Sequence, residues 1–172
     1  MDLGETLRQA VPEALGAYVI GVDHVALAVP DLEASLRFYC GLLGFQKVAE
    51  RATQGQRTGM RSAVVRAGDL TLVLVVGTEP ESQVSRFVER CGPGVQHVAL
   101  RVTCLERAMA GLAARGVRFD TDPIEGPFTR QVFLARDDAA AVRVELIERR
   151  GDGFSDGPVQ QLFRTMEAKD LW

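Results

Sequence analysis

The sequence predicts an α+β fold in which two copies of one strand–helix–three-strand (βαβββ) unit share a single domain. Three observations predict it: an internal repeat, the same order of strand and helix patterns in each copy, and histidines at equivalent positions of the repeat. Residues 21–33 read GVDHVALAVPDLE and residues 94–106 read GVQHVALRVTCLE, which are identical at nine of thirteen positions at an offset of 73. Self-similarity of this kind indicates a duplicated structural unit.

Each copy opens with a strand and continues into a helix. Residues 22–29 and 95–102 are dominated by β-branched and apolar side chains, which favour strands. Apolar residues then recur at helical spacing in both copies. Asp31 is suited to cap the first helix, and Gly44 and Gly116 are suited to end the two helices. Three strands are expected after each helix, at residues 46–51, 62–66 and 70–76, and at residues 118–119, 131–136 and 142–147.

The units define five segments along the chain. They are an N-terminal helical extension (1–19), a first βαβββ module (20–78), a linker helix segment (79–93), a second βαβββ module (94–149), and a loop with a C-terminal helix (150–172). Within the flanks and the linker we expect helices at residues 3–15, 82–90 and 158–169. Pro158 suits the first turn of the last helix.

Composition narrows the class of protein. The chain has 172 residues, 47% of them hydrophobic and 25% charged, which is typical of a globular domain. A formal net charge of -3 without a dense Lys/Arg run gives no basis for binding nucleic acid. No apolar run approaches the roughly 20 residues of a membrane span, and the N-terminus does not have the pattern of a secretory signal. With three scattered cysteines, these features predict a cytoplasmic protein with reduced thiols.

The two histidines and one glutamate suggest a metal site. His24 and His97 are the only histidines, and pseudo-twofold packing of the repeats would bring them together. Glu145 lies within the apolar strand VRVELI, where a carboxylate is costly unless it is coordinated or paired, for example with Arg143. The repeat offset places Leu72 opposite Glu145, and no metal-binding side chain lies between residues 70 and 77. Two histidines and one carboxylate favour Fe(II) oxygen chemistry, although Zn(II) can use the same ligands.

These motifs resemble a known superfamily. HVALAVPDLEASLRFYCGLLGF is similar to the opening of vicinal oxygen chelate proteins, which include glyoxalases, epimerases, dioxygenases and bleomycin-resistance proteins. TEPESQVSRFVERCGPGVQHVAL and VELIERRGDGFSDGPVQQLFRTME resemble the catalytic C-terminal half of the 4-hydroxyphenylpyruvate dioxygenase family. The resemblance, over roughly residues 20–170, implies one vicinal-oxygen-chelate domain around a central metal, and a homodimer. It also implies that His24, His97 and Glu145 are the catalytic Fe(II) ligands.

The same resemblance implies a substrate and a pocket. The substrate would chelate the iron through a 2-oxo acid group, and dioxygen would be the co-substrate for decarboxylation and hydroxylation. Thr78 stands where the family usually has Asn, and Val159 where it usually has Phe; these changes favour a different or bulkier substrate. Gln83 and Gln131 could instead be ordinary exposed amides. The substrate-binding positions are Ser62, Thr78, Gln83, Gln96, Gln131, Phe133, Phe154 and Val159.

Three functions follow from the sequence. The leading hypothesis is an Fe(II)-dependent dioxygenase or hydroxylase that acts on a 2-oxo acid or a related small organic substrate. The first alternative is a metal-dependent isomerase, epimerase or lyase of the same superfamily. The second is a non-catalytic protein that binds a small molecule such as an antibiotic. Extradiol ring cleavage is disfavoured because there is no third histidine to act as an acid or base.

Overall fold

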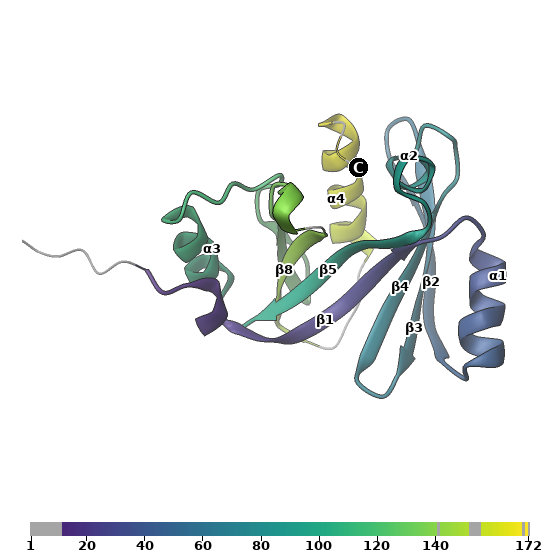
Figure 1. Cartoon of the computed structure of the whole chain (residues 1–172), viewed down its shortest axis with the longest axis horizontal. Coiled ribbons are helices and arrows are strands. Elements are labelled where there is room, and N and C mark those ends of the chain that lie inside the picture. Colours follow the sequence, from purple (N-terminus) through teal and green to yellow (C-terminus); the bar gives the residue numbers. More distant parts are fainter. Residues whose placement is uncertain (1–11, 141, 152–155, 170, 172) are drawn as a thin grey trace, which may run out of the picture.

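A computed structural model describes residues 12–140, 142–151, 156–169 and 171 (Figure 1). Its centre is one eight-stranded sheet with the strand order β2-β3-β4-β1-β5-β8-β7-β6. The first half of the fold contains, in chain order, a 3-10 turn (Leu15–Ala17), β1 (Val19–Ala28), α1 (Leu32–Leu36), a π-helical turn (Arg37–Leu42), β2 (Gln46–Gln54), β3 (Gly59–Ala67) and β4 (Leu70–Gly77).

The linker and the second half follow the same pattern. They contain α2 (Gln83–Cys91), β5 (Gly94–Val102), α3 (Leu105–Ala113), β6 (Ile124–Glu125), β7 (Thr129–Phe133), a 3-10 turn (Asp138–Ala140), β8 (Arg143–Arg149) and α4 (Asp156–Ala168). The α+β fold of two strand–helix–three-strand units is therefore confirmed. None of the helices in the described ranges is both long and apolar enough to span a membrane.

Pseudo-twofold symmetry relates the two halves. The strands β1 and β5 are antiparallel neighbours at the middle of the sheet, and each pairs in parallel with the last strand of its own half, β4 or β8. Figure 1 shows these two long strands crossing between the halves. Equivalent residues of the repeat therefore meet across the centre of the molecule.

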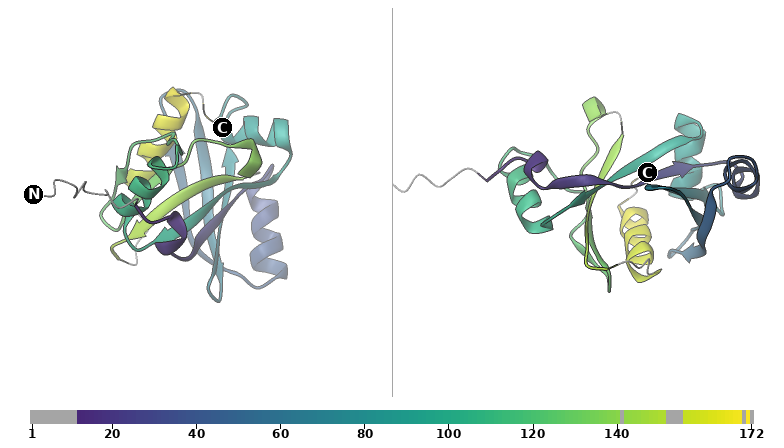
Figure 2. Two further views of the ribbon diagram at one scale, coloured as in Figure 1. Left: turned by 60° about the vertical axis from the view of Figure 1, so that its left-hand side comes forward. Right: turned by 90° about the horizontal axis from the view of Figure 1, so that it is seen from below.

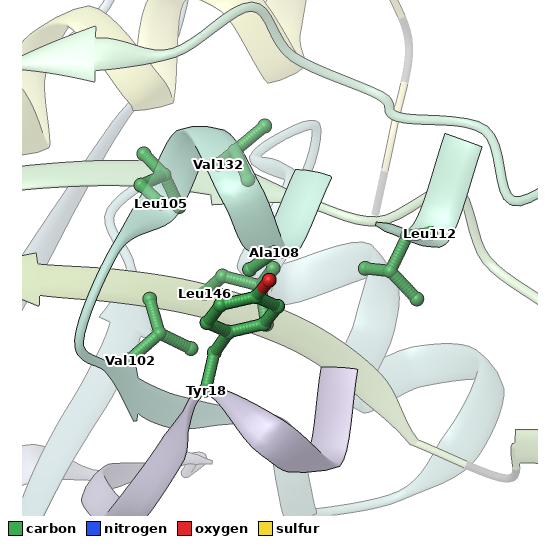
Figure 3. Close-up of a cluster of buried hydrophobic side chains, with 7 residues drawn as sticks. All are labelled: Tyr18, Val102, Leu105, Ala108, Leu112, Val132 and Leu146. Carbon is green, nitrogen blue, oxygen red and sulfur yellow. The ribbon is translucent and has the colours of Figure 1, made fainter. Parts of the chain in front are cut away.

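Each half has an apolar core between its sheet and its own helix. Leu72 and Leu74 of β4 pack with Leu32 of α1 in the first half. The second core surrounds α3 and consists of Tyr18, Val102, Leu105, Ala108, Leu112, Val132 and Leu146 (Figure 3). Because side chains alternate along a strand, the opposite face of each half remains available for a site.

The C-terminal helix α4 lies on that second face. It lies between the two halves in Figures 1 and 2, and it contacts β2 and β6, the two edge strands of the sheet. The carboxylate of Glu167 holds it in place by accepting backbone N–H bonds from Gln56 (2.7 Å), Arg57 (3.1 Å) and Thr58 (2.8 Å). The helix therefore covers the interior of the curled sheet.

Several predicted elements differ from the structure. The short strand expected at residues 118–119 is reduced to one bridge between Phe119 and Leu134, because Phe119 packs into the α3 core; the paired strand is β6 instead. The strand expected at 131–136 starts and ends earlier, as β7. The helices expected at 82–90 and 158–169 are confirmed as α2 and α4. Most of the helix expected at 3–15 lies outside the described residues.

Candidate metal centre

Three side chains converge where the two halves meet. The Nε2 atoms of His24 and His97 are 3.3 Å apart, and each lies 3.4 Å from Oε2 of Glu145. They belong to β1, β5 and β8, respectively, and their ligand atoms all lie within 4.8 Å of one another. The structure thus brings together the three residues that the sequence predicted as metal ligands.

Strand register explains this convergence. In the antiparallel β1–β5 pair, His24 lies opposite Ala99 and Ala26 lies opposite His97, so the two rings are placed symmetrically about the same point. Glu145 then lies beside Ala99 on the parallel neighbour β8. The ring of Phe133 packs edge-on against that of His97, with centroids 5.1 Å apart, and supports its orientation.

A hydrogen bond from the other ring nitrogen orients each histidine. Nδ1 of His24 lies 3.0 Å from Oδ1 of Asp23, and Nδ1 of His97 is bonded to Oε1 of Gln96. Asp23 and Gln96 are themselves equivalent positions of the repeat. Because both partners are acceptors, each Nδ1 carries the proton and each Nε2 presents its lone pair to the centre, as in a metal-ligating histidine.

A guanidinium clamp holds Asp23 in turn. Arg149 donates to both carboxylate oxygens, at 2.6 and 2.8 Å, and Arg101 adds a contact of 3.2 Å. Burial raises the pKa of Asp23, but the hydrogen bonds from His24 and Arg149 outweigh burial, and the pKa lies below its ordinary value. Asp23 is therefore an ionised, immobile acceptor behind His24.

The donor set fits a cation. Two imidazole lone pairs and a carboxylate oxygen face one another with no donor between them, an arrangement that is unfavourable unless a proton or a cation lies among them. Burial raises the pKa of Glu145 to about 7 and lowers the pKa of His97 to about 3. Both shifts have the same cause, because burial disfavours the charged form of each side chain. A divalent ion would offset the cost of burying the Glu145 carboxylate.

The equivalent of Glu145 in the first half is Val73. Ala26 pairs with Val73, just as its repeat equivalent Ala99 pairs with Glu145. The sequence offset had pointed to Leu72, which is wrong by one residue because the two halves differ in length between these strands. Val73 lines the site, whereas Leu72 faces the α1 core. The corrected position is also apolar, so the described part of the chain offers three ligands at this centre.

A pocket rises from the three ligands toward α4. Ser62 and Gln131, both buried, and Val159 line it, as the sequence predicted. Its other walls are largely apolar and come from β3, β4, β8 and α4: Met60, Val73, Val75, Ile147, Pro158 and Leu162. Arg51, Thr129 and Arg149 supply its remaining polar groups.

Other predicted pocket residues lie elsewhere. Thr78 is exposed and donates to the carboxylate of Glu79 at 2.6 Å. Gln83 is buried in a separate polar cavity on the first residues of α2, beside Arg86. Gln96 and Phe133 contact His97 instead of lining the pocket, and Phe154 lies outside the described residues.

Two alternatives that the sequence left open concern single residues. Gln83 and Gln131 are both 6% exposed, so neither is an ordinary surface amide. The carboxylate partner that the structure gives Arg143 is Asp120, at 3.2 Å. Sequence reasoning also missed Asp23 and its clamp. An aspartate next to a ligand histidine, inside an otherwise apolar strand, was the available signal.

Known proteins share this architecture. The sequence profile of the glyoxalase/bleomycin resistance protein/dioxygenase superfamily matches residues 21–146. The chain belongs to this superfamily. The crystal structure of methylmalonyl-CoA epimerase from Mycobacterium tuberculosis is 30% identical, with a TM-score of 0.67, and the match covers 78% of this chain and 91% of that one.

Dioxygenases are also among the relatives of this chain. The 4-hydroxyphenylpyruvate dioxygenase of Coccidioides posadasii is 31% identical over 68% of this chain, but the match spans only 32% of that enzyme. A mutant of 4-hydroxymandelate synthase from Streptomyces coelicolor has a TM-score of 0.77 over 87% of this chain and 54% of that one. At 21% identity the latter likeness establishes a common fold alone.

Proposed function

We propose that the chain is a divalent-metal enzyme in which His24, His97 and Glu145 hold the ion and a small organic acid completes its coordination. The convergence of three acceptor atoms beneath a largely apolar pocket carries this proposal. Because Val73 at the fourth symmetry position is apolar, a bound ion would have coordination positions left for substrate oxygens. When bound, the ion would supply Lewis-acid polarisation of those oxygens and, as Fe(II), access to oxygen chemistry.

The chain's own residues would orient the substrate and exclude water. The Ser62 and Thr129 hydroxyls and the Gln131 amide are buried polar groups on the pocket wall, suited to bind substrate oxygens. The apolar side chains of β4, β8 and α4 would surround the remainder of the substrate. The favoured ligand therefore has a chelating acid group at one end and an apolar body.

Similarity over nearly the full length of a relative favours a reaction of the isomerase, epimerase or lyase class. The match spans 91% of the M. tuberculosis epimerase but about a third of the fungal dioxygenase. An enzyme of that class would polarise a carbonyl at the metal and move a proton at the adjacent carbon. For such an enzyme the likeness to methylmalonyl-CoA epimerase suggests an acyl thioester as substrate.

One observation favours the dioxygenase or hydroxylase class as a second candidate. Apart from the three ligands, the polar groups of the described pocket wall are Arg51, Ser62, Thr129, Gln131 and Arg149. Hydroxyl, amide and guanidinium groups are not among the usual general bases, so none of these side chains is suited to remove and return a proton. An Fe(II)-dependent oxidation of a 2-oxo acid needs open coordination positions and no such base.

One experiment separates these reactions. Protein loaded anaerobically with Fe(II) or Co(II) would be given 2-oxo acids and 2-substituted acyl thioesters in D2O. Deuterium incorporation beside the carbonyl without dioxygen identifies the proton-transfer class. Oxygen uptake that depends on Fe(II) and substrate identifies the dioxygenase class. The same assays on metal-free protein provide the matched control.

A third outcome would contradict catalysis. If the metal-loaded protein binds these acids but turns over none of them with or without dioxygen, it is a binding protein, as the second alternative from the sequence holds. Failure of His24→Ala to reduce metal content would contradict the metal centre itself. The homodimer that the family resemblance implies stays a prediction, and sedimentation equilibrium would test it.

A further inference from the structure

A second polar cavity lies behind the metal centre. It is bounded by the C-terminal end of α2, the first residues of β5 and the first residue of β8. Its polar side chains are Gln96, Arg136 and Arg143, and no carboxylate is among the described residues that line it. Two guanidinium groups and an amide around one concavity make a surface suited to an anion.

The two arginines occupy different depths. Arg143 is 5% exposed, and its guanidinium is held by Asp120 at 3.2 Å. Arg136 is exposed and lies at the rim. A buried, pre-positioned guanidinium loses little side-chain freedom when it binds an oxyanion, and the rim arginine supplies a second charge-assisted contact.

The cavity is also joined to the metal centre. Gln96 lines the cavity, while its Oε1 accepts the hydrogen bond from Nδ1 of His97. The amide nitrogen of the same side chain can donate to an oxyanion in the cavity. Arg143 lies directly opposite His97 in the β5–β8 register. A bound anion would therefore act on the hydrogen bond that orients a metal ligand.

We propose that this cavity binds a small tetrahedral oxyanion, a phosphate or sulfate group, and that the bound anion strengthens metal binding. Arg143 forms the floor of the site, Arg136 its rim, and Gln96 the connection to His97. Negative charge behind His97 stabilises the divalent ion in front of it, and by thermodynamic linkage the metal must tighten anion binding by the same factor. The anion site itself stands whichever reaction the metal centre performs.

Sulfate is a suitable probe because it is a weak metal ligand. Sulfate binding to the metal-loaded protein would be measured by calorimetry at constant ionic strength, with chloride as the balancing anion. Arg136→Gln should weaken sulfate binding about tenfold, the effect of losing one charge-assisted hydrogen bond. Arg107→Gln, which removes an equal charge from the exposed face of α3, should leave it unchanged.

The outcomes are distinct. Equal sulfate binding in wild type, Arg136→Gln and Arg107→Gln would place the anion elsewhere, at the metal or on the surface, and would overturn the proposal. Binding of acetate as tight as that of sulfate would overturn the tetrahedral specificity.

Coupling is measured separately. Chelator competition should show metal affinity rising about fivefold at saturating sulfate. That rise should be lost in Gln96→Ala, and a rise that persists in this variant would contradict the proposed connection. Loss of metal binding without loss of sulfate binding would fault the metal centre but not this site.

Discussion

The two halves of the molecule have the same scaffold but contribute unequally to the candidate metal centre. β1 and β5 each supply one histidine at the same position, oriented by the residue before it. The neighbouring parallel strands differ, because β8 supplies Glu145 where β4 supplies Val73. Pseudo-symmetry thus brings the candidate ligands together, while a single side chain decides how many ligands a bound ion would receive.

The oriented histidines differ too. His24 is held by an ionised carboxylate that Arg149 clamps, whereas His97 is held by the neutral amide of Gln96. One half therefore places charge behind its ligand, and the other places a neutral amide beside a polar cavity. The first half has the more rigid support, and the second half is the one that a bound anion can influence.

The largest effect is expected from removing a shared ligand. Both His24→Ala and His97→Ala should lower metal affinity by more than about 100-fold, because each loss exceeds what changes in supporting residues cause. Metal content after dialysis and chelator competition measure this. If one histidine proved dispensable, the equivalence of the two halves at this centre would be wrong.

A carboxylate ligand in the first half, equivalent to Glu145, should block substrate access to the metal. Val73→Glu places a carboxylate at the repeat equivalent of Glu145, so it should raise metal affinity and abolish substrate-dependent activity by filling an open position. Leu72→Glu is the matched control: its charge would enter the α1 core and should cost about 3–5 kcal/mol of folding stability. Denaturant unfolding and metal titration distinguish them, and similar behaviour of the two variants would refute the register.

Replacing the charged supporting residue, Asp23, should lower metal affinity more than replacing the neutral one, Gln96. Asp23→Asn should weaken metal binding by about 10–100-fold, since it removes the ionised acceptor behind His24 and leaves Arg149 without it. Gln96→Ala removes only a neutral acceptor and should have a smaller effect, of about tenfold or less. Chelator competition on both variants tests the order. A larger loss in Gln96→Ala than in Asp23→Asn would contradict the stronger support of His24 by its charged neighbour.

The smallest expected effect is a pH dependence of metal affinity, which arises from Glu145 in the second half. Because the pKa of Glu145 is raised to about 7, protons compete with the metal below that pH, and metal affinity should fall about fivefold between pH 7 and pH 6. His97, with a pKa of about 3, stays neutral over this range. Metal titrations at several pH values measure the slope.

The sign of the stability effect in the metal-free protein is opposite. The pKa of Glu145 is higher in the folded protein than its ordinary value of 4.5. The protonated side chain therefore contributes fully to folding stability below pH 4.5, and this contribution is lost as the pH rises through 7. Glu145→Gln should therefore become more stable relative to metal-free wild type between about pH 4.5 and pH 7. Thermal unfolding checks this, and an unchanged difference would contradict the raised pKa.

Much of the fold was predictable because the signals were local or repeated. Runs of β-branched and apolar residues indicated most strands, and Asp31 does cap α1 by accepting the backbone N–H of Ala34. The π-helical turn after α1 and the position of β6 were not predictable, since they depend on packing against the sheet. Gln83 shows the same limit in the site: its helix was predicted, but the cavity it faces depends on Glu167 of the distant α4.

By itself the sequence determined the duplicated unit, the class of fold and the three converging residues. A repeat with one histidine in each copy predicts that pseudo-twofold packing brings the two histidines together. Only the tertiary structure decided that Val73 is the counterpart of Glu145, that Asp23 and Gln96 orient the histidines, and that α4 covers the pocket. These facts depend on strand register and on contacts between residues more than 100 positions apart, such as Glu167 with Thr58. A single sequence carries no direct record of such contacts, because they arise only when the sheet curls and brings its edges together.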